Sequence, residues 1–395
     1  MPGGLHMHVG GLTWGCVNGR RSHQSSLGGL QLRCARVDKP RLPMVFARAL
    51  RKRHALHSSL HPLWIALLTD TTFSSVSKKN KMAASQDSNG LTLTVLGSGT
   101  MGIAIMGGVM ASLAAAKTQS AISDAPKDTP NLANFIACDA WAPAEEKVKA
   151  ALGHYNFPLT TLTNNNLEGI QKGDILLLSC KPHIFKDILG EDGVREALRG
   201  KVLVSILAGV TQEQIEGFLY PDGAPENACR VVRVMPNTAS FVRESMSVIQ
   251  TSTPPLKPEQ HKLVEFIFSS IGRVVTLPPA LMDISTALCG SGPAFFALVL
   301  EAAADAGVAM GLPRAEAQIM AAQTMRGTTG LVLEGGEHPA ILRDKVSTPG
   351  GCTIGGLLAL EEGGVRGAFS RAVREATCVA SQLGQGVKNV NGTRR

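Results

Sequence analysis

The first regular hydrophobic pattern is a run of strand-forming residues, 91–96, that stops at a glycine-rich turn. The apolar stretch after the turn is helical in character, so residues 91–108 predict strand, turn and helix. Gly97 permits the tight turn, Gly99 lets the backbone approach a pyrophosphate, and Gly102 lets helix and strand pack closely. The N–H groups at the helix start form an anion site. A GxGxxG also occurs in purely structural turns, and the flanking strand and helix are what favour a dinucleotide site.

Alternating strands and helices continue to residue 235. The strand runs are apolar on both faces, as expected of buried parallel strands, and the connections between them are short. This pattern predicts a doubly wound α/β sheet, with a polar surface insertion over residues 117–134. Strands are expected at 135–138, 174–180, 202–207 and 230–235, and helices at 144–152, 184–189 and 212–218.

The character changes at residue 284, after which no strand signal appears. Long Ala- and Gly-rich helices are expected at 294–310, 314–334 and 364–383, the first with Ser291 as its N-cap. The fold class is therefore α/β, a Rossmann-type doubly wound parallel sheet followed by an all-α dimerisation domain whose surface forms a subunit interface. The expected boundaries are a leader over 1–90, the nucleotide domain over 91–275, the helical domain over 276–385 and a disordered tail over 386–395.

Charge is concentrated at the N-terminus. Residues 1–90 carry 13 of the 39 Lys and Arg and three of the 31 Asp and Glu, so the rest carries 26 and 28. The near-neutral body argues against nucleic-acid binding. The Arg- and Ser-rich leader is either a mitochondrial transit segment or sequence that the working protein lacks, and Met82 offers a natural start. We favour the second alternative and expect a cytoplasmic protein.

The eight cysteines are scattered, with no CxxC pair and no zinc spacing, so we expect free thiols and no metal. The apolar run in the leader is too short to span a bilayer, and no membrane partner is expected.

Three polar segments follow predicted strands, at the edge where open parallel sheets bind ligands. Lys181 either meets a phosphate or ribose or is a solvated charge. Asn237 either orients a carboxamide or substrate or forms an Asx turn. His183 is interpreted as a turn residue. The segments are residues 180–183, 208–211 and 235–238.

A second candidate is the polar glycine loop 346–354, between two helices. Its consecutive N–H groups, with the hydroxyls of Ser347, Thr348 and Thr353, would enclose a carboxylate. The alternative is a helix–helix turn with Thr353 as the next N-cap. Both readings can hold, because a helix N-terminus is itself an anion site. No nucleophile–base motif is present, which assigns the chemistry to a cofactor.

Together these segments resemble the pyrroline-5-carboxylate reductases of proline biosynthesis. The matching pieces are VLGSGTMG, DILLLSCKPH, VSILAGVT, RVMPNTAS, ALCGSGPAFF, ADAGVAMGLPR and DKVSTPGGCTIGGL, over residues 91–383. The resemblance implies reduction of (S)-1-pyrroline-5-carboxylate to L-proline by NADPH or NADH. It also implies a homodimer, in some members a decamer built from dimers, whose site joins one subunit's nucleotide domain to the partner's helices.

The resemblance also implies roles for particular residues. The hydroxyl of Thr353 would hydrogen-bond the ring nitrogen, and the loop backbone would hold the substrate carboxylate. Substrate-binding residues are Thr348, Gly350, Gly351, Cys352 and Thr353, and cofactor-binding residues are Leu96, Gly97, Ser98, Gly99, Thr100, Met101, Asn166, Cys180, Lys181, Ala208 and Asn237.

Three positions depart from the family pattern. Ala239 replaces a usual Pro, and Cys352 stands where Ala or Thr is common, which exposes the site to thiol oxidation. Asp139 ends the second strand where a Ser- or Arg-bearing turn is expected. An acid there hydrogen-bonds a free ribose and repels a 2′-phosphate, so it favours NADH.

Two other functions compete. A different Rossmann reductase would place a catalytic Lys in the helical domain, where Lys345 is the candidate near the loop. A catalytically silent nucleotide sensor is disfavoured by the complete GSGTMG and STPGGCT loops.

Overall fold

The computed structural model describes residues 90–120, 129–387 and 390, all within the compact unit Ala84–Arg395. The expectations about the leader, its Met82 start and most of the tail lie outside the described residues. So does the central part of the predicted insertion.

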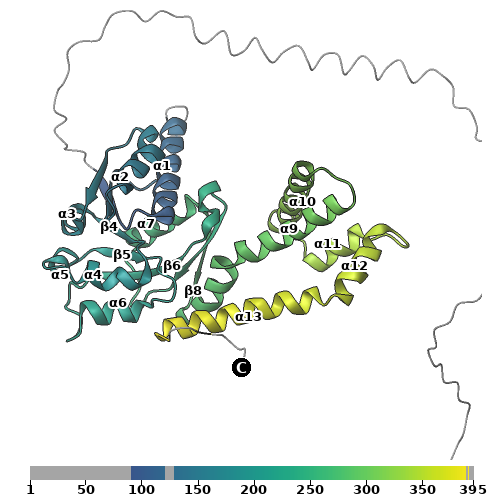
Figure 1. The fold of residues 1–395 in the computed structure, drawn as a ribbon. Helices are drawn as coiled ribbons and strands as arrows, with labels where there is room; N and C mark the ends of the chain where they lie inside the picture. The colour runs from purple at the N-terminus through teal and green to yellow at the C-terminus, as the bar shows by residue number, and fades with distance from the viewer. Residues whose placement is uncertain (1–89, 121–128, 388–389, 391–395) are drawn as a thin grey trace, which may run out of the picture. The chain divides into compact units, whose positions relative to one another are not determined.

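An eight-stranded sheet forms the N-terminal part, in the order β3-β2-β1-β4-β5-β6-β7-β8 (Figure 1). Pairing is parallel from β3 through β6 and again between β7 and β8, whereas β6 and β7 are antiparallel. The parallel-dominated, doubly wound fold class is therefore confirmed, with one antiparallel step that was not predicted. The strands are β1 (Leu91–Leu96), β2 (Leu132–Asp139), β3 (Leu159–Thr163), β4 (Ile175–Leu178), β5 (Val202–Ser205), β6 (Arg230–Met235), β7 (Ser245–Gln250) and β8 (Gly272–Leu277).

Both faces of the sheet are buried, which explains the continuous apolar runs. Side chains alternate along a strand, so Val95 enters the core on one face and its neighbour Leu96 the core on the other. The first core is covered by α1 (Thr100–Ser120), α2 (Ala144–Leu152) and α7 (Pro258–Ser269). The second is covered by α3 (Asn166–Lys172), α4 (Phe185–Leu189), α5 (Val194–Ala197) and α6 (Gln212–Leu219).

Several sequence predictions of this part are wrong in detail. Strands β3, β7 and β8 and helices α3 and α7 were not predicted, and β8 runs to Leu277, past the expected boundary at residue 275. The predicted insertion is shorter than expected, because its start continues α1 and its end belongs to β2. Helix α2 and strand β6 have the predicted bounds.

The C-terminal part is helical and contains no strand in the region the structure describes. Ser291 is the N-cap residue of α9, as predicted. It nevertheless has helical φ and ψ, its side chain makes no cap bond, and it follows a π-helical turn that continues into α9. Helix α11 was also not predicted. The elements are η4 (Pro279–Leu281), α8 (Met282–Ser285), η5 (Thr286–Gly290), α9 (Gly292–Ala309), α10 (Arg314–Leu333), α11 (Pro339–Val346), α12 (Cys352–Glu362) and α13 (Val365–Gly384).

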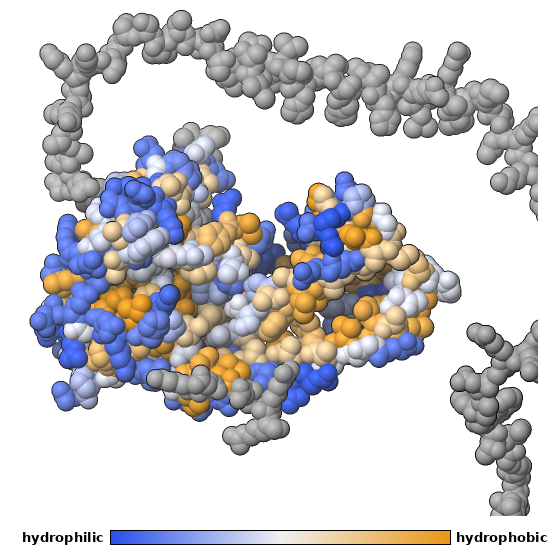
Figure 2. Space-filling view, viewed as in Figure 1, coloured by the Kyte–Doolittle hydropathy of each residue, from blue (hydrophilic) through white to orange (hydrophobic). Residues whose placement is uncertain are grey.

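Large apolar side chains of these helices are exposed. Leu298 on α9 is 67% exposed, Ile319 on α10 69% and Leu358 on α12 58%. Apolar patches lie over this part of the surface in Figure 2. Helix α1 and the segment 279–309 are long and apolar enough to cross a membrane, but α1 packs in the core of the sheet domain. Apolar patches of this kind mark interaction surfaces.

The C-terminal end of α13 returns to the sheet domain. Gln214 Nε2, in the first turn of α6, donates to the carbonyl of Gly384 at 2.6 Å. A Cβ on Gly209 would lie 3.2 Å from Leu383, so this glycine lets the two parts approach closely.

Candidate functional site

The glycine turn between β1 and α1 has the geometry expected of a phosphate cradle. Gly97 has φ of +92°, and a Cβ there would lie 2.7 Å from the Cys180 backbone. A Cβ on Gly102 would lie 2.8 Å from Val95 and from the Gly97 carbonyl. Gly99 differs, because a Cβ there would meet nothing within 4 Å. Packing therefore requires glycine at two positions, while the third faces open space that a ligand can approach.

Ser98 stabilises this turn from within. Its N–H and its hydroxyl both donate to the Cys138 carbonyl, at 3.2 and 3.1 Å, and Gly97 N–H donates to the same oxygen at 2.9 Å. The buried Ser98 side chain therefore holds the turn against the end of β2. Because α1 begins at Thr100, the N–H groups of its first turn have no partner within the helix and remain for an anion. The Leu96 side chain is buried in the core, so only its backbone lies at the turn.

The segment after β4 braces the same turn. Ser179 Oγ donates to the Gly97 carbonyl at 2.6 Å. Burial raises the pKa of the Cys180 thiol to about 11, so this side chain is a neutral packing group. Lys181 is exposed and precedes the 3₁₀ turn η2 (Pro182–Ile184), which contains His183 as predicted.

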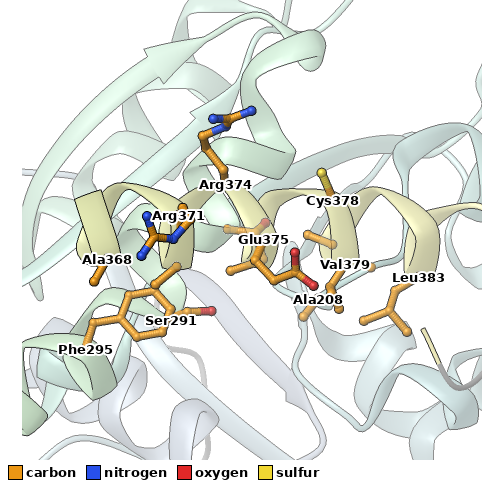
Figure 3. Close-up of a pocket in the computed structure, with 15 residues that line it drawn as sticks. Ala208, Ser291, Phe295, Ala368, Arg371, Arg374, Glu375, Cys378, Val379 and Leu383 are labelled. Atoms are coloured by element: carbon orange, nitrogen blue, oxygen red, sulfur yellow. The ribbon is translucent and has the colours of Figure 1, made fainter. Parts of the chain in front are cut away.

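Ala208 lies where the sheet domain meets the helical part. With Gly209 it lines one wall of a cavity of about 900 Å³, whose other walls come from η5, the start of α9 and α13. Figure 3 shows Ser291 and Phe295 on one side and the α13 side chains Arg371 and Glu375 on another. The predicted cofactor residue Ala208 therefore opens onto a cavity that spans both parts of the chain.

Asn237 forms the Asx turn given as its alternative. Its Oδ1 accepts from Ala239 N–H at 3.0 Å and caps the 3₁₀ helix η3 (Thr238–Val242). The Ser245 hydroxyl accepts from Asn237 N–H at 3.1 Å, which fixes the backbone. The oxygen is therefore occupied, and the amide nitrogen is the part that can orient a ligand.

Asn166 begins α3, and its Nδ2 donates to Glu191 at 2.7 Å.

Asp139, the last residue of β2, accepts from Trp141 N–H at 2.9 Å. Asp139 lines a cavity of about 600 Å³ together with Ser98 and Gly99, so it lies beside the glycine turn. Trp141 and Lys147 line the same cavity and were not among the predicted site residues. Trp141 lies two residues beyond the strand end, a position from which its role could have been suspected.

The second predicted site is a β-turn between α11 and α12. Gly351 N–H donates to the Thr348 carbonyl at 3.0 Å, and Gly350 has φ of +67°, which this turn requires of its third residue. Gly351 is the N-cap of α12, so the alternative role of Thr353 as N-cap is wrong and Thr353 lies in the first helical turn. The Ser347 hydroxyl donates to the Arg343 carbonyl at 2.9 Å and ends α11 instead of facing the loop.

The structure therefore brings the predicted residues together in two groups. The first lies at the carboxyl edge of the sheet, around the glycine turn and the segments after β2, β3, β4, β5 and β6. The second is the exposed turn Thr348–Thr353, which lies at the end of the helical part away from the sheet (Figure 1). In the described residues, no group of three or more His, Cys, Asp or Glu side chains could hold a metal ion.

Comparisons with protein families match both parts. Residues 279–383 match the pyrroline-5-carboxylate reductase dimerisation model, and residues 92–209 match the model described as NADP oxidoreductase, coenzyme F420-dependent.

Individual relatives agree with these models. The chain is 57% identical over 318 residues to a pyrroline-5-carboxylate reductase of Lophium arboricola, covering 79% of this chain and 99% of the relative. It is 53% identical over 334 residues to the enzyme of the same name from Neurospora crassa, with 79% and 100% covered. A crystal structure of Plasmodium falciparum pyrroline carboxylate reductase with NADP bound is similar at a TM-score of 0.60 and 27% identity, over 74% of this chain and 98% of that one.

Proposed function

The chain belongs to the pyrroline-5-carboxylate reductase family, and from this premise we propose how its residues perform the reaction. The chain is an NAD(P)H-dependent oxidoreductase that reduces 1-pyrroline-5-carboxylate to L-proline. The observation that carries this conclusion is the 57% identity to a reductase that the chain covers over 99% of its length. When bound, the cofactor would supply a hydride to the imine carbon of the ring, the carbon that is doubly bonded to the ring nitrogen.

The sheet edge provides the cofactor site. The open space at Gly99 and the first N–H groups of α1 fit a pyrophosphate, because both favour close approach of an anion to the backbone. Asn166, Cys180 and Lys181 follow the nucleotide along the same edge. Ala208 and Asn237, after β5 and β6, lie nearest the substrate end.

The turn Thr348–Thr353 provides the substrate site. The N-terminus of α12 and the backbone of Gly350, Gly351 and Cys352 hold the substrate carboxylate. The hydroxyl of Thr353 donates to the ring nitrogen. An imine accepts hydride more readily as its nitrogen gains positive character, so one oriented donor and a fixed carboxylate lower the barrier.

The variants Thr353→Val and Thr353→Ser test this role. Valine keeps the shape of the side chain and removes the hydroxyl, while serine keeps the hydroxyl. We expect kcat/KM to fall by about 10²-fold or more with valine and by much less with serine, because general acid contributions are of that order. Equal activity of all three proteins in a proline-formation assay would refute the assignment of Thr353.

The protein is a homo-oligomer. We propose further that the turn Thr348–Thr353 acts on the sheet edge of a second copy, because both groups are incomplete alone and exposed apolar helices surround the turn. Dimers of this kind can assemble further into a decamer. Mass photometry of the full chain separates the dimer from the larger assembly.

Subunit mixing tests the shared site. Gly99→Ala weakens the cofactor half and Thr353→Val the substrate half, so each homodimer has low activity when the cofactor concentration is near its wild-type Kd. Co-expressed in one cell, the two chains form heterodimers with one intact site, which predicts recovery of about a quarter of wild-type activity for random pairing. An inactive mixture that still contains heterodimers would place both halves in one chain.

Asp139 sets the cofactor preference in this proposal. It lines the cavity beside the glycine turn, where a carboxylate accepts from the free ribose hydroxyls of NADH and repels a 2′-phosphate. We expect a higher kcat/KM with NADH than with NADPH, and Asp139→Asn lowers that ratio. A ratio below one in the unmodified protein would overturn the preference.

We propose a cytoplasmic protein that starts at Met82, because this methionine lies a few residues before the first strand. N-terminal peptide mapping and cell fractionation decide the matter, and recovery of a processed protein in mitochondria would establish the transit alternative.

A reductase with a catalytic lysine in the helical domain is disfavoured, because the candidate Lys345 is already paired. The ammonium of Lys345 pairs with the carboxylate of Glu337, which lies just before α11. A sensor without turnover would bind nucleotide and produce no proline.

A further inference from the structure

The cavity beside Asp139 contains an unassigned basic and aromatic pair. It lies between α1 and α2, has a volume of about 600 Å³, and begins at Ser98 and Gly99 of the glycine turn. Besides Asp139 and the hydroxyl groups of Ser98 and Thr100, its lining includes the side chains of Trp141 and Lys147. A ligand that extends from the turn past the end of β2 enters this space.

The pair is held in a defined arrangement. Lys147 Nζ lies 4.2 Å from the centroid of the Trp141 ring, within cation–π distance. The carboxylate of Asp139 accepts from the Trp141 backbone N–H at 2.9 Å, so the acid is fixed to the backbone of the residue that carries the aromatic ring. Trp141 is 52% exposed, which leaves much of a large apolar ring uncovered.

Lys147 forms no ion pair with a carboxylate in the part of the chain that the structure describes. Lys149, two residues further along α2, is paired with Glu145. Only the first of these two lysines lines the cavity. The ammonium of Lys147 is therefore available to a ligand, and an ammonium is a common phosphate-binding group.

The cavity thus carries two side chains of opposite charge at the place proposed for the adenosine ribose. Asp139 accepts from ribose hydroxyls and repels a phosphate, whereas Lys147 attracts one. We propose that Lys147, carried over the cavity by Trp141, binds the 2′-phosphate of NADPH and keeps this cofactor usable despite Asp139. The inference rests on the proposed placement of the cofactor ribose at Asp139, and it adds Lys147 as a second specificity residue.

Calorimetric titration of the full chain tests this role without turnover. The probes are adenosine 2′,5′-bisphosphate, which carries the 2′-phosphate, and 5′-AMP, which lacks it. We expect Lys147→Ala to weaken binding of the bisphosphate about tenfold and to leave 5′-AMP within about twofold, since one charge-assisted contact is removed. Lys147→Arg keeps the charge and restores binding. Lys149→Ala is the matched control on the same helix and changes neither affinity.

Fluorescence locates the ligand. Trp14→Phe and Trp64→Phe leave Trp141 as the single tryptophan of the chain. We expect the bisphosphate to change its emission, and Lys147→Ala to shift this response to about tenfold higher ligand concentration. An unchanged emission at saturation would place the ligand elsewhere.

Each other result is decisive. If Lys147→Ala weakens both probes equally, or neither, the specificity role is refuted while the nucleotide site stands. If neither probe binds the unmodified chain, the placement of the nucleotide at the glycine turn fails, and the proposed cofactor site fails with it.

Discussion

Gly99→Ala separates ligand binding from folding at the glycine turn. The added methyl group meets no atom within 4 Å, and Gly99 does not have a positive φ. We therefore expect the free energy of unfolding to change by no more than about 0.5 kcal/mol, the range of a substitution without packing consequences. Nucleotide affinity, in contrast, should fall sharply, because the methyl group occupies the space through which a pyrophosphate reaches the backbone.

The size of the affinity loss follows from the contacts that the methyl group prevents. A hydrogen bond between a backbone N–H and a charged phosphate contributes about 1.5–3 kcal/mol. Losing one such bond weakens binding by roughly 10- to 100-fold.

Gly97→Ala is the contrasting variant in the same turn. It places a Cβ at φ of +92° and 2.7 Å from the Cys180 backbone. The left-handed conformation and the backbone shift together cost roughly 3 kcal/mol. That loss lowers the melting temperature by about 6–12 °C for a chain of this size.

Thermal melting and calorimetric titration with NADH and NADPH on both variants provide the assay. The expected result is a stable, weakly binding Gly99→Ala protein beside a destabilised Gly97→Ala protein. If Gly99→Ala binds nucleotide as tightly as the unmodified chain, the cradle does not hold the pyrophosphate. If it unfolds as easily as Gly97→Ala, the open space at Gly99 is not real.

Three further predictions concern stability. Burial raises the pKa of Cys138 and Cys229 to about 12, so the folded state keeps protons that the unfolded state releases above its ordinary value of 9.0. The contribution of these thiols to stability is therefore complete below pH 9. As the pH rises from 9 toward 12, the free energy of unfolding falls by about 1.4 kcal/mol per pH unit for each thiol. Denaturant unfolding across that range measures this slope, and Cys138→Ala makes the slope shallower. Asp283→Ala leaves the buried Arg233 guanidinium without its partner at 3.8 Å and should lower the free energy of unfolding by about 3 kcal/mol. Arg233→Met should lower it less, because the side chain of the remaining carboxylate is 34% exposed. Equal losses of stability for the two variants in denaturant melts would contradict this asymmetry. Phe268→Ala removes a fully buried ring of the sheet core and should cost about 3–5 kcal/mol in the same melts, and a loss below 1 kcal/mol would mean that the core there is loosely packed.

The parts of the fold that the sequence predicts are those in which local pattern and tertiary environment agree. Strands β1, β4, β5 and β6 lie inside the sheet, so both of their faces are apolar and the runs are easy to recognise. Strand β3 is an edge strand with three threonines, and β8 at the other edge has alternating exposed residues. Their polar composition reflects incomplete burial. Because it interrupts the apolar pattern, these two strands could not be recognised from the sequence.

The site divides in a similar way. The roles of Gly97 and Gly102 could be inferred from the motif, because they depend on contacts between adjacent elements. The pairing of Lys147 with Trp141 could not, since it depends on how α2 packs beside the end of β2. Arg233 is a buried charge inside an apolar strand, and its partner Asp283 lies on a helix of the other part. Sequence alone offers no rule for such a long-range pair.

The exposure of the helical part links association to catalysis. Leu298 and Ile319 are more than half exposed, whereas most leucines and isoleucines of the sheet strands are almost completely buried. A chain with such surfaces gains stability by covering them, and the turn Thr348–Thr353 lies among the same helices. If a second copy covers these surfaces, the contact that stabilises the helices also brings the turn to a sheet edge. Substrate binding would then depend on subunit association, whereas the nucleotide site lies within one chain. Dilution that separates the subunits should therefore remove activity before it removes nucleotide binding.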